Sequence, residues 1–193
     1  MSKQKLSLFK RSWDSAIDRQ LIRTDNRTLV TALRRDLVKK ARAFTLLHLS
    51  LPDVVGHASG FMGPEYHDAV AATDARLGLI LRTIDNHPKL TKHLAVIVVA
   101  DHGGRGPRHY NPTKLANYRI PFLVWGPGVA VGQSLYALNP DYQDPGKTRP
   151  TYGAAKQPVR NADAANLALD LLGLPAVPGS KMDAAQDLDV LAP

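Results

Sequence analysis

The chain has 193 residues, of which 44% are hydrophobic and none is cysteine, and its formal net charge is +8. This length and composition suit one domain with a genuine hydrophobic core. The lack of cysteine excludes a disulfide framework and a thiolate-bound zinc site, so any transition metal would have to be held by His, Asp or Glu.

The excess positive charge lies in a basic N-terminal segment, residues 1–43, which carries 12 Lys/Arg against 4 Asp. Such a segment can bind nucleic acid, but its cations are scattered among aspartates without interleaved aromatic residues, which favours a solvated surface. The N-terminus lacks an apolar export signal, and no stretch approaches the ~18 apolar residues of a membrane span. We therefore expect a soluble, cytoplasmic protein as written, with nucleic-acid binding as a minor alternative.

The basic segment contains the first predicted helix. Leu29, Val30, Leu33 and Leu37 recur at three- and four-residue spacing, which is typical of an amphipathic helix capped by Asp25 or its neighbour.

An apolar run follows this helix. Residues 44–50 predict a buried strand that stops before Pro52, because proline removes a ladder donor. We expect His48, inside this strand, to be a core residue or to bond a ligating carboxylate.

The rest of the chain alternates predicted helices and strands. The patterns predict a helix over 70–84, strands over 94–100 and 120–125, and a helix over 161–172 that stops at Gly173. Residues 127–160 form a long Gly/Pro-rich loop without periodicity. This alternation predicts an α/β fold with a mostly parallel central sheet and helices on both faces.

Two clusters of Asp and His fall at predicted strand ends. Asp53 and His57 follow the first strand, and Asp101 and His102 follow the second, with His109 seven residues further on. Carboxylate oxygens and imidazole nitrogens suit Zn²⁺, with Mn²⁺ as the alternative. A single Asp-His-Gly is typical of a turn, but two such clusters favour a metal site.

The same segments resemble those of a known family. Pro-Asp-Val-Val-Gly-His at 52–57 is similar to the Pro-Asp-x-x-Gly-His segment of the type I phosphodiesterases and nucleotide pyrophosphatases of the alkaline phosphatase superfamily. Residues 98–104 resemble the second metal segment of that family, and residues 161–175 resemble its closing helix. The resemblance implies an alkaline-phosphatase-like fold with two metal sites.

The resemblance also assigns the ligands. Asp53, His57 and His109 would hold one metal ion, and Asp101 and His102 would belong to the other. In the family, a further metal-binding Asp and a Thr or Ser nucleophile precede the Pro-Asp-x-x-Gly-His segment, and residues 1–52 show neither. We therefore expect residues 1–193 to form a single partial domain that lacks the N-terminal strand and nucleophile helix and has an incomplete second site.

These observations predict a function. We expect a truncated metal-dependent hydrolase of a small-molecule phosphate ester, of phosphodiesterase or phosphatase type, with weak or no activity. The alternative is a non-catalytic metal-binding or interaction domain derived from the family. A sheet that lacks its first strand would expose an edge, which predicts self-association.

Overall fold

The computed structural model describes residues 17–40 and 42–192, and Asp25 caps the first helix in this range. Helix α2 spans Asn26–Lys39, and the Asp25 carboxylate accepts hydrogen bonds from the backbone N–H groups of Arg27 and Thr28. These bonds satisfy two of the four free donors at a helix start. The predicted helix and its cap are thus confirmed, whereas residues 1–16 of the basic segment, including the predicted lack of an export signal, lie outside the described residues.

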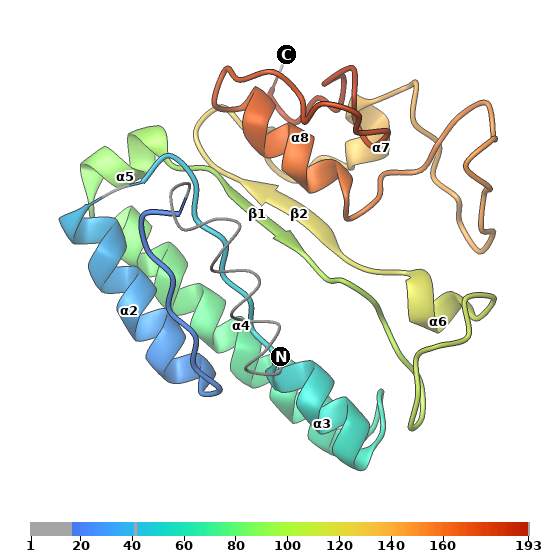
Figure 1. The fold of residues 1–193 in the computed structure, drawn as a ribbon, viewed down its shortest axis with the longest axis horizontal. Coiled ribbons are helices and arrows are strands. Elements are labelled where there is room, and N and C mark those ends of the chain that lie inside the picture. The colour runs from blue at the N-terminus through green and yellow to red at the C-terminus, as the bar shows by residue number, and fades with distance from the viewer. Residues whose placement is uncertain (1–16, 41, 193) are drawn as a thin grey trace.

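A helical layer forms the first hydrophobic core. Helix α4, Pro64–Asp85, confirms and extends the helix predicted over 70–84, and α2 packs along it together with the short α5, Pro88–His93 (Figure 1). The buried side chains of this core are Val30, Leu37, Ile80, Ile84 and Leu90.

The sheet has two strands, β1 at Val96–Val99 and β2 at Phe122–Trp125, and they run antiparallel. In the described residues, therefore, the predicted mostly parallel sheet is not present, although the mixed α/β composition is. The connection between the strands contains only a single helical turn, α6 at Leu115–Tyr118, and no helix long enough for a parallel crossover. The chain turns back instead and pairs β2 directly against β1.

The strand predicted over 44–50 is also absent. This segment has no regular secondary structure and joins no ladder, and Phe44 and Leu46 are 58% and 82% exposed. His48, expected in a buried strand, is exposed as well. A short apolar run does not by itself reveal whether a partner strand lies beside it, and here none does among the described residues.

The C-terminal region covers one face of the sheet. Leu167 of α8, Asp163–Asp170, and the later residues Leu188 and Val190 pack against side chains of both strands (Figure 1). Gly173, with φ +68°, follows the end of α8, as the sequence predicts. Between residues 127 and 160 the only regular element is α7, Leu135–Leu138.

Candidate metal centre

Asp53 and His57 lie on a helix, not beyond a strand as expected. Helix α3 spans Leu51–Ser59, and Pro52 stands in its first turn. Backbone N–H groups in the first turn have no intrahelical acceptor, so the missing N–H of proline costs no hydrogen bond there. The four-residue spacing puts the two side chains on the same helical face, and His57 Nε2 lies 3.4 Å from Asp53 Oδ1. Proline therefore starts a helix here, where the sequence pattern suggested the end of a strand.

Asp101 and His102 follow the C-terminal end of β1, as predicted. His102 Nδ1 lies 2.8 Å from the carbonyl oxygen of Gly103, so Nδ1 donates this bond and Nε2 is left as the acceptor. That Nε2 lies 3.6 Å from Asp53 Oδ1 and 3.6 Å from Asp101 Oδ2. The Asp101 side chain is 75% exposed and stands at the rim of the cluster.

A glycine allows the turn after His102 to fit. The Cβ atom of any other residue at Gly103 would collide with the carbonyl oxygen of Ala116, in helix α6. The side-chain amide of Asn161 donates to the carbonyl oxygens of Ala100 and Asp101, at 3.3 and 3.1 Å. The strand end that carries Asp101 and His102 is thus held from two sides.

His109 joins the two clusters. Its Nε2 lies 3.0 Å from His57 Nε2 and 4.0 Å from Asp53 Oδ1, and its ring stacks on that of His102 with centroids 3.7 Å apart. Burial, followed by the neighbouring His102 and His57 imidazoles, lowers the pKa of His109 below its usual value. The ring is thereby kept neutral, and neutral imidazole is the form that binds metals.

Asp53 Oδ1 is the common centre of this arrangement. It is buried and has no hydrogen-bond partner among the described residues, although three imidazole Nε2 atoms lie within 4.0 Å of it. The ligand atoms of Asp53, His57 and His109 all lie within 4.8 Å of one another, and no other set of three His, Asp or Glu in residues 17–40 and 42–192 does so. A buried carboxylate oxygen without a partner, beside imidazole nitrogens, fits a divalent cation.

Phe61 was not predicted as part of this region. It is only 5% exposed, and its ring centroid lies 5.3 Å from that of His57 and 5.5 Å from that of His109. Nothing in the sequence separates it from an ordinary core aromatic residue, because its contact with His109 depends on how distant segments fold together.

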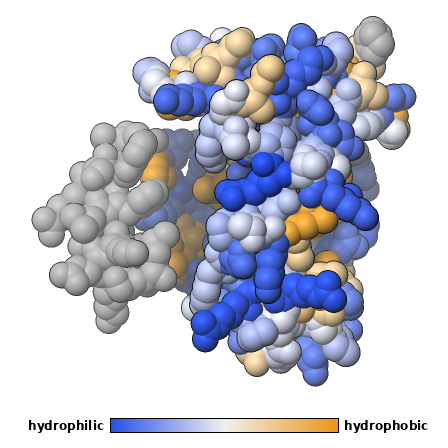
Figure 2. All heavy atoms as spheres, turned by 90° about the vertical axis from the view of Figure 1, so that its right-hand side faces the viewer, coloured by the Kyte–Doolittle hydropathy of each residue, from blue (hydrophilic) through white to orange (hydrophobic). Residues whose placement is uncertain are grey.

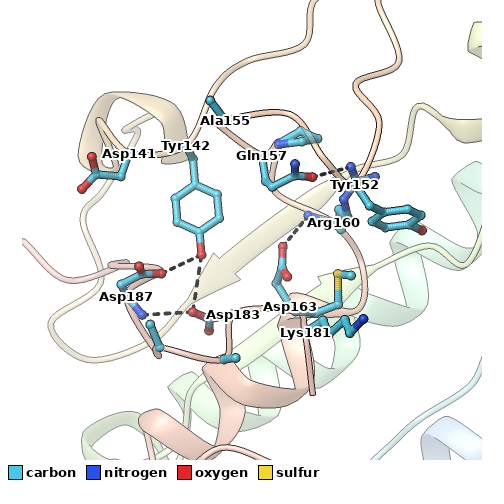
Figure 3. Close-up of a pocket in the computed structure, with 14 residues that line it drawn as sticks. Asp141, Tyr142, Tyr152, Ala155, Gln157, Arg160, Asp163, Lys181, Asp183 and Asp187 are labelled. Atoms are coloured by element: carbon cyan, nitrogen blue, oxygen red, sulfur yellow. Dashed lines mark hydrogen bonds between the residues drawn. The ribbon is translucent and has the colours of Figure 1, made fainter. Parts of the chain in front are cut away.

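A separate cavity of about 560 Å³ lies among the C-terminal loops, and none of the five predicted ligands lines it (Figure 3). The Tyr142 hydroxyl lies 2.9 Å from Asp187 Oδ1 and 3.4 Å from Asp183 Oδ1. Burial raises the pKa of Asp163 to about 6, although the Arg160 backbone N–H donates to its carboxylate. Its concentration of carboxylates makes this cavity a poor place for a phosphate ester.

The fold and the cluster define a class of protein: a mixed α/β chain with a histidine and carboxylate site fit for a divalent cation. Residues 3–153 match the family described as type I phosphodiesterase / nucleotide pyrophosphatase. The chain belongs to this family, within the alkaline phosphatase superfamily, and the match supports a metal-dependent phosphoric ester hydrolase. No curated protein and no solved structure showed significant similarity to the chain. None of the helices in the described ranges is long and apolar enough to cross a membrane.

Proposed function

We propose that the chain binds Zn²⁺, with Mn²⁺ as the alternative, through Asp53, His57 and His109, and that Asp101 and His102 belong to a second, incomplete site. The observation that carries this proposal is the buried Asp53 Oδ1, which lacks a hydrogen-bond partner and faces three imidazole Nε2 atoms. The family match supports a phosphate ester as the ligand, and we propose a phosphodiester or nucleotide pyrophosphate.

The described side chains suggest how such an ester is bound. A divalent ion at this site would neutralise negative charge on the phosphate oxygens. Burial lowers the pKa of His109, which favours its neutral form, and the Gly103 carbonyl fixes the orientation of His102. Arg105 and Arg108, both exposed on the loop between His102 and His109, add positive charge that attracts the anion.

The described part of the chain also suggests a low rate of turnover. No serine or threonine hydroxyl there is hydrogen-bonded to any of the five proposed ligands. A nucleophile held at the ion is what displacement at phosphorus requires. We therefore propose weak or no hydrolysis by the 193-residue polypeptide alone, and a non-catalytic metal-binding domain remains the second candidate.

Metal titration combined with an activity assay tests these proposals. We expect the wild type to bind Zn²⁺ in calorimetry and Asp53→Asn to lose this binding. Asp68→Asn, which changes an exposed aspartate on α4, serves as the matched control and should bind like the wild type. A wild type that takes up neither Zn²⁺ nor Mn²⁺ would contradict the metal site.

Hydrolysis of bis-p-nitrophenyl phosphate separates the hydrolase from the non-catalytic domain. We expect a rate at or barely above background with added Zn²⁺ or Mn²⁺. Robust metal-dependent turnover that His102→Ala abolishes would refute the proposal of weak activity. Salt-dependent DNA binding without metal uptake would instead favour the nucleic-acid alternative.

We also propose that the chain self-associates through its small sheet. Leu123 and Trp125 of β2 are 61% and 37% exposed and project from the same face, because alternate residues of a strand share a face. The face drawn in Figure 2 is mostly hydrophilic, with a few separate hydrophobic patches. Sedimentation analysis should show a concentration-dependent dimer that Leu123→Lys weakens.

A further inference from the structure

Phe61 contacts every imidazole of the candidate metal centre. Its ring centroid lies 5.3 Å from that of His57, 6.2 Å from His102 and 5.5 Å from His109. The planes cross at 80°, 71° and 79°, so each contact is edge-to-face, a favoured geometry for aromatic rings. One buried ring therefore touches three side chains that come from two distant segments.

The backbone of Phe61 also joins those two segments. Its N–H donates to the carbonyl oxygen of Gly106 at 2.7 Å, and Gly106 N–H donates back to the carbonyl oxygen of Phe61 at 3.1 Å. This reciprocal pair ties the residues just after α3 to the loop between His102 and His109. The Phe61 ring is consequently fixed relative to both halves of the site.

Two glycines make room for this ring. A Cβ atom at Gly56, inside α3, or at Gly104, in the turn after β1, would overlap ring carbons of Phe61. Glycine within a helix is destabilising relative to alanine, so its presence at position 56 has a local disadvantage. A side chain at position 56 would have to displace the buried Phe61 ring.

We propose that Phe61 is a positioning residue that sets the ring orientations of His57, His102 and His109 so that their Nε2 atoms face one point. The proposal rests on the proposed metal-binding function. Phe61 has no ligand atom and acts only through the imidazoles: without its ring, each could rotate about its side-chain bonds, and the Nε2 atoms would diverge. Substitution of a group that orients metal ligands typically lowers the metal affinity 10- to 100-fold.

The first test compares Phe61→Leu with Ile84→Val, a fully buried control in the helical core. Calorimetry would measure the dissociation constant for Zn²⁺, and thermal unfolding in EDTA would confirm that both variants fold. We expect at least a 10-fold weaker affinity in Phe61→Leu and an unchanged affinity in Ile84→Val. Equal affinities in the wild type and Phe61→Leu would overturn the proposal.

The second test uses the metal-free protein and does not depend on metal binding. The stacked rings of His102 and His109, 3.7 Å apart, should give strong nuclear Overhauser effects between their ring protons. We expect these to weaken or vanish in Phe61→Leu and to persist in Ile84→Val. If the wild type bound no metal, the proposed function would fail, but the role of Phe61 would still be decided here: unchanged effects in Phe61→Leu would refute it.

A double-mutant cycle checks that Gly104 affects metal binding through the Phe61 ring. Gly104→Ala should displace Phe61 and weaken Zn²⁺ binding in the wild-type background. In the Phe61→Ala background the space is vacant, so the same substitution should have little further effect. Additive losses of affinity would show that Gly104 and Phe61 act separately, against the proposal.

Discussion

Asp53→Asn should leave the metal-free protein at least as stable as the wild type but make the Zn²⁺-bound protein less stable. In EDTA at pH 7.5, the substitution removes the charge of a half-exposed carboxylate whose buried Oδ1 has no hydrogen-bond partner in the described residues. The amide nitrogen of the new side chain can instead donate to the His57 Nε2, which lies 3.4 Å from Asp53 Oδ1. One such bond contributes about 0.5–1.5 kcal/mol, so the metal-free variant should equal or exceed the wild type.

With Zn²⁺ the order should reverse. An ion that binds only the folded state at 100 times its dissociation constant stabilises that state by about 2.7 kcal/mol, and Asp53→Asn should lose this gain. Urea unfolding followed by circular dichroism, with EDTA and with Zn²⁺, measures all four free energies. Equal stabilisation of the wild type and the variant by Zn²⁺ would show that Asp53 is not a ligand.

Three further substitutions test other parts of the structure. Asp163→Asn should stabilise the protein at pH 7.5 by at most about 3 kcal/mol, because a pKa raised from 3.8 to about 6 penalises the charged carboxylate in the folded state. That penalty is absent below pH about 4, grows between pH about 4 and 6 and is complete above pH about 6, so urea midpoints of the two proteins should converge in acid. Asp25→Ala should lower the thermal midpoint at neutral pH by removing the cap of α2, and an unchanged midpoint would contradict the capping role. Hydrogen bonds from Thr28 and Arg27 lower the pKa of Asp25, so this loss should shrink as the pH falls through that pKa. Gly103→Ala should destabilise the fold by about 1–3 kcal/mol and weaken Zn²⁺ binding, because its Cβ meets backbone that cannot move aside easily. Unaltered urea unfolding in that variant would argue against the close approach of α6.

Local patterns predicted helices α2, α4 and α8, but they did not predict α3. The three- and four-residue spacing from Leu29 to Leu37 and the Asp25 cap are properties of adjacent residues, and the structure confirms both. The position of Asp101 and His102 at the end of β1 followed from a run of β-branched residues. Helix periodicity, helix caps and strand ends depend on residues that are close together in the sequence.

Pairing across the chain was harder to predict. Residues 44–50 look like a strand, but a strand also needs a neighbour, and none lies beside them in the described structure. Pro52 was ambiguous because proline both ends strands and begins helices. Likewise, the contacts of Phe61 and the antiparallel direction of β2 depend on how distant segments fold together, which spacing along the sequence does not reveal.

The long sequence separation of His57 and His109 means that an ion bound to both would join distant parts of the chain. These ligands are 52 residues apart, and the intervening chain includes α4, α5 and β1. An ion held by both would cross-link the polypeptide much as a disulfide does. Unlike a disulfide, the ion would leave when the chain unfolds, so its stabilising effect would be the free energy of binding to the folded state. In a chain with no cysteine, the metal centre would thus also be a cross-link that closes one long loop of the folded protein.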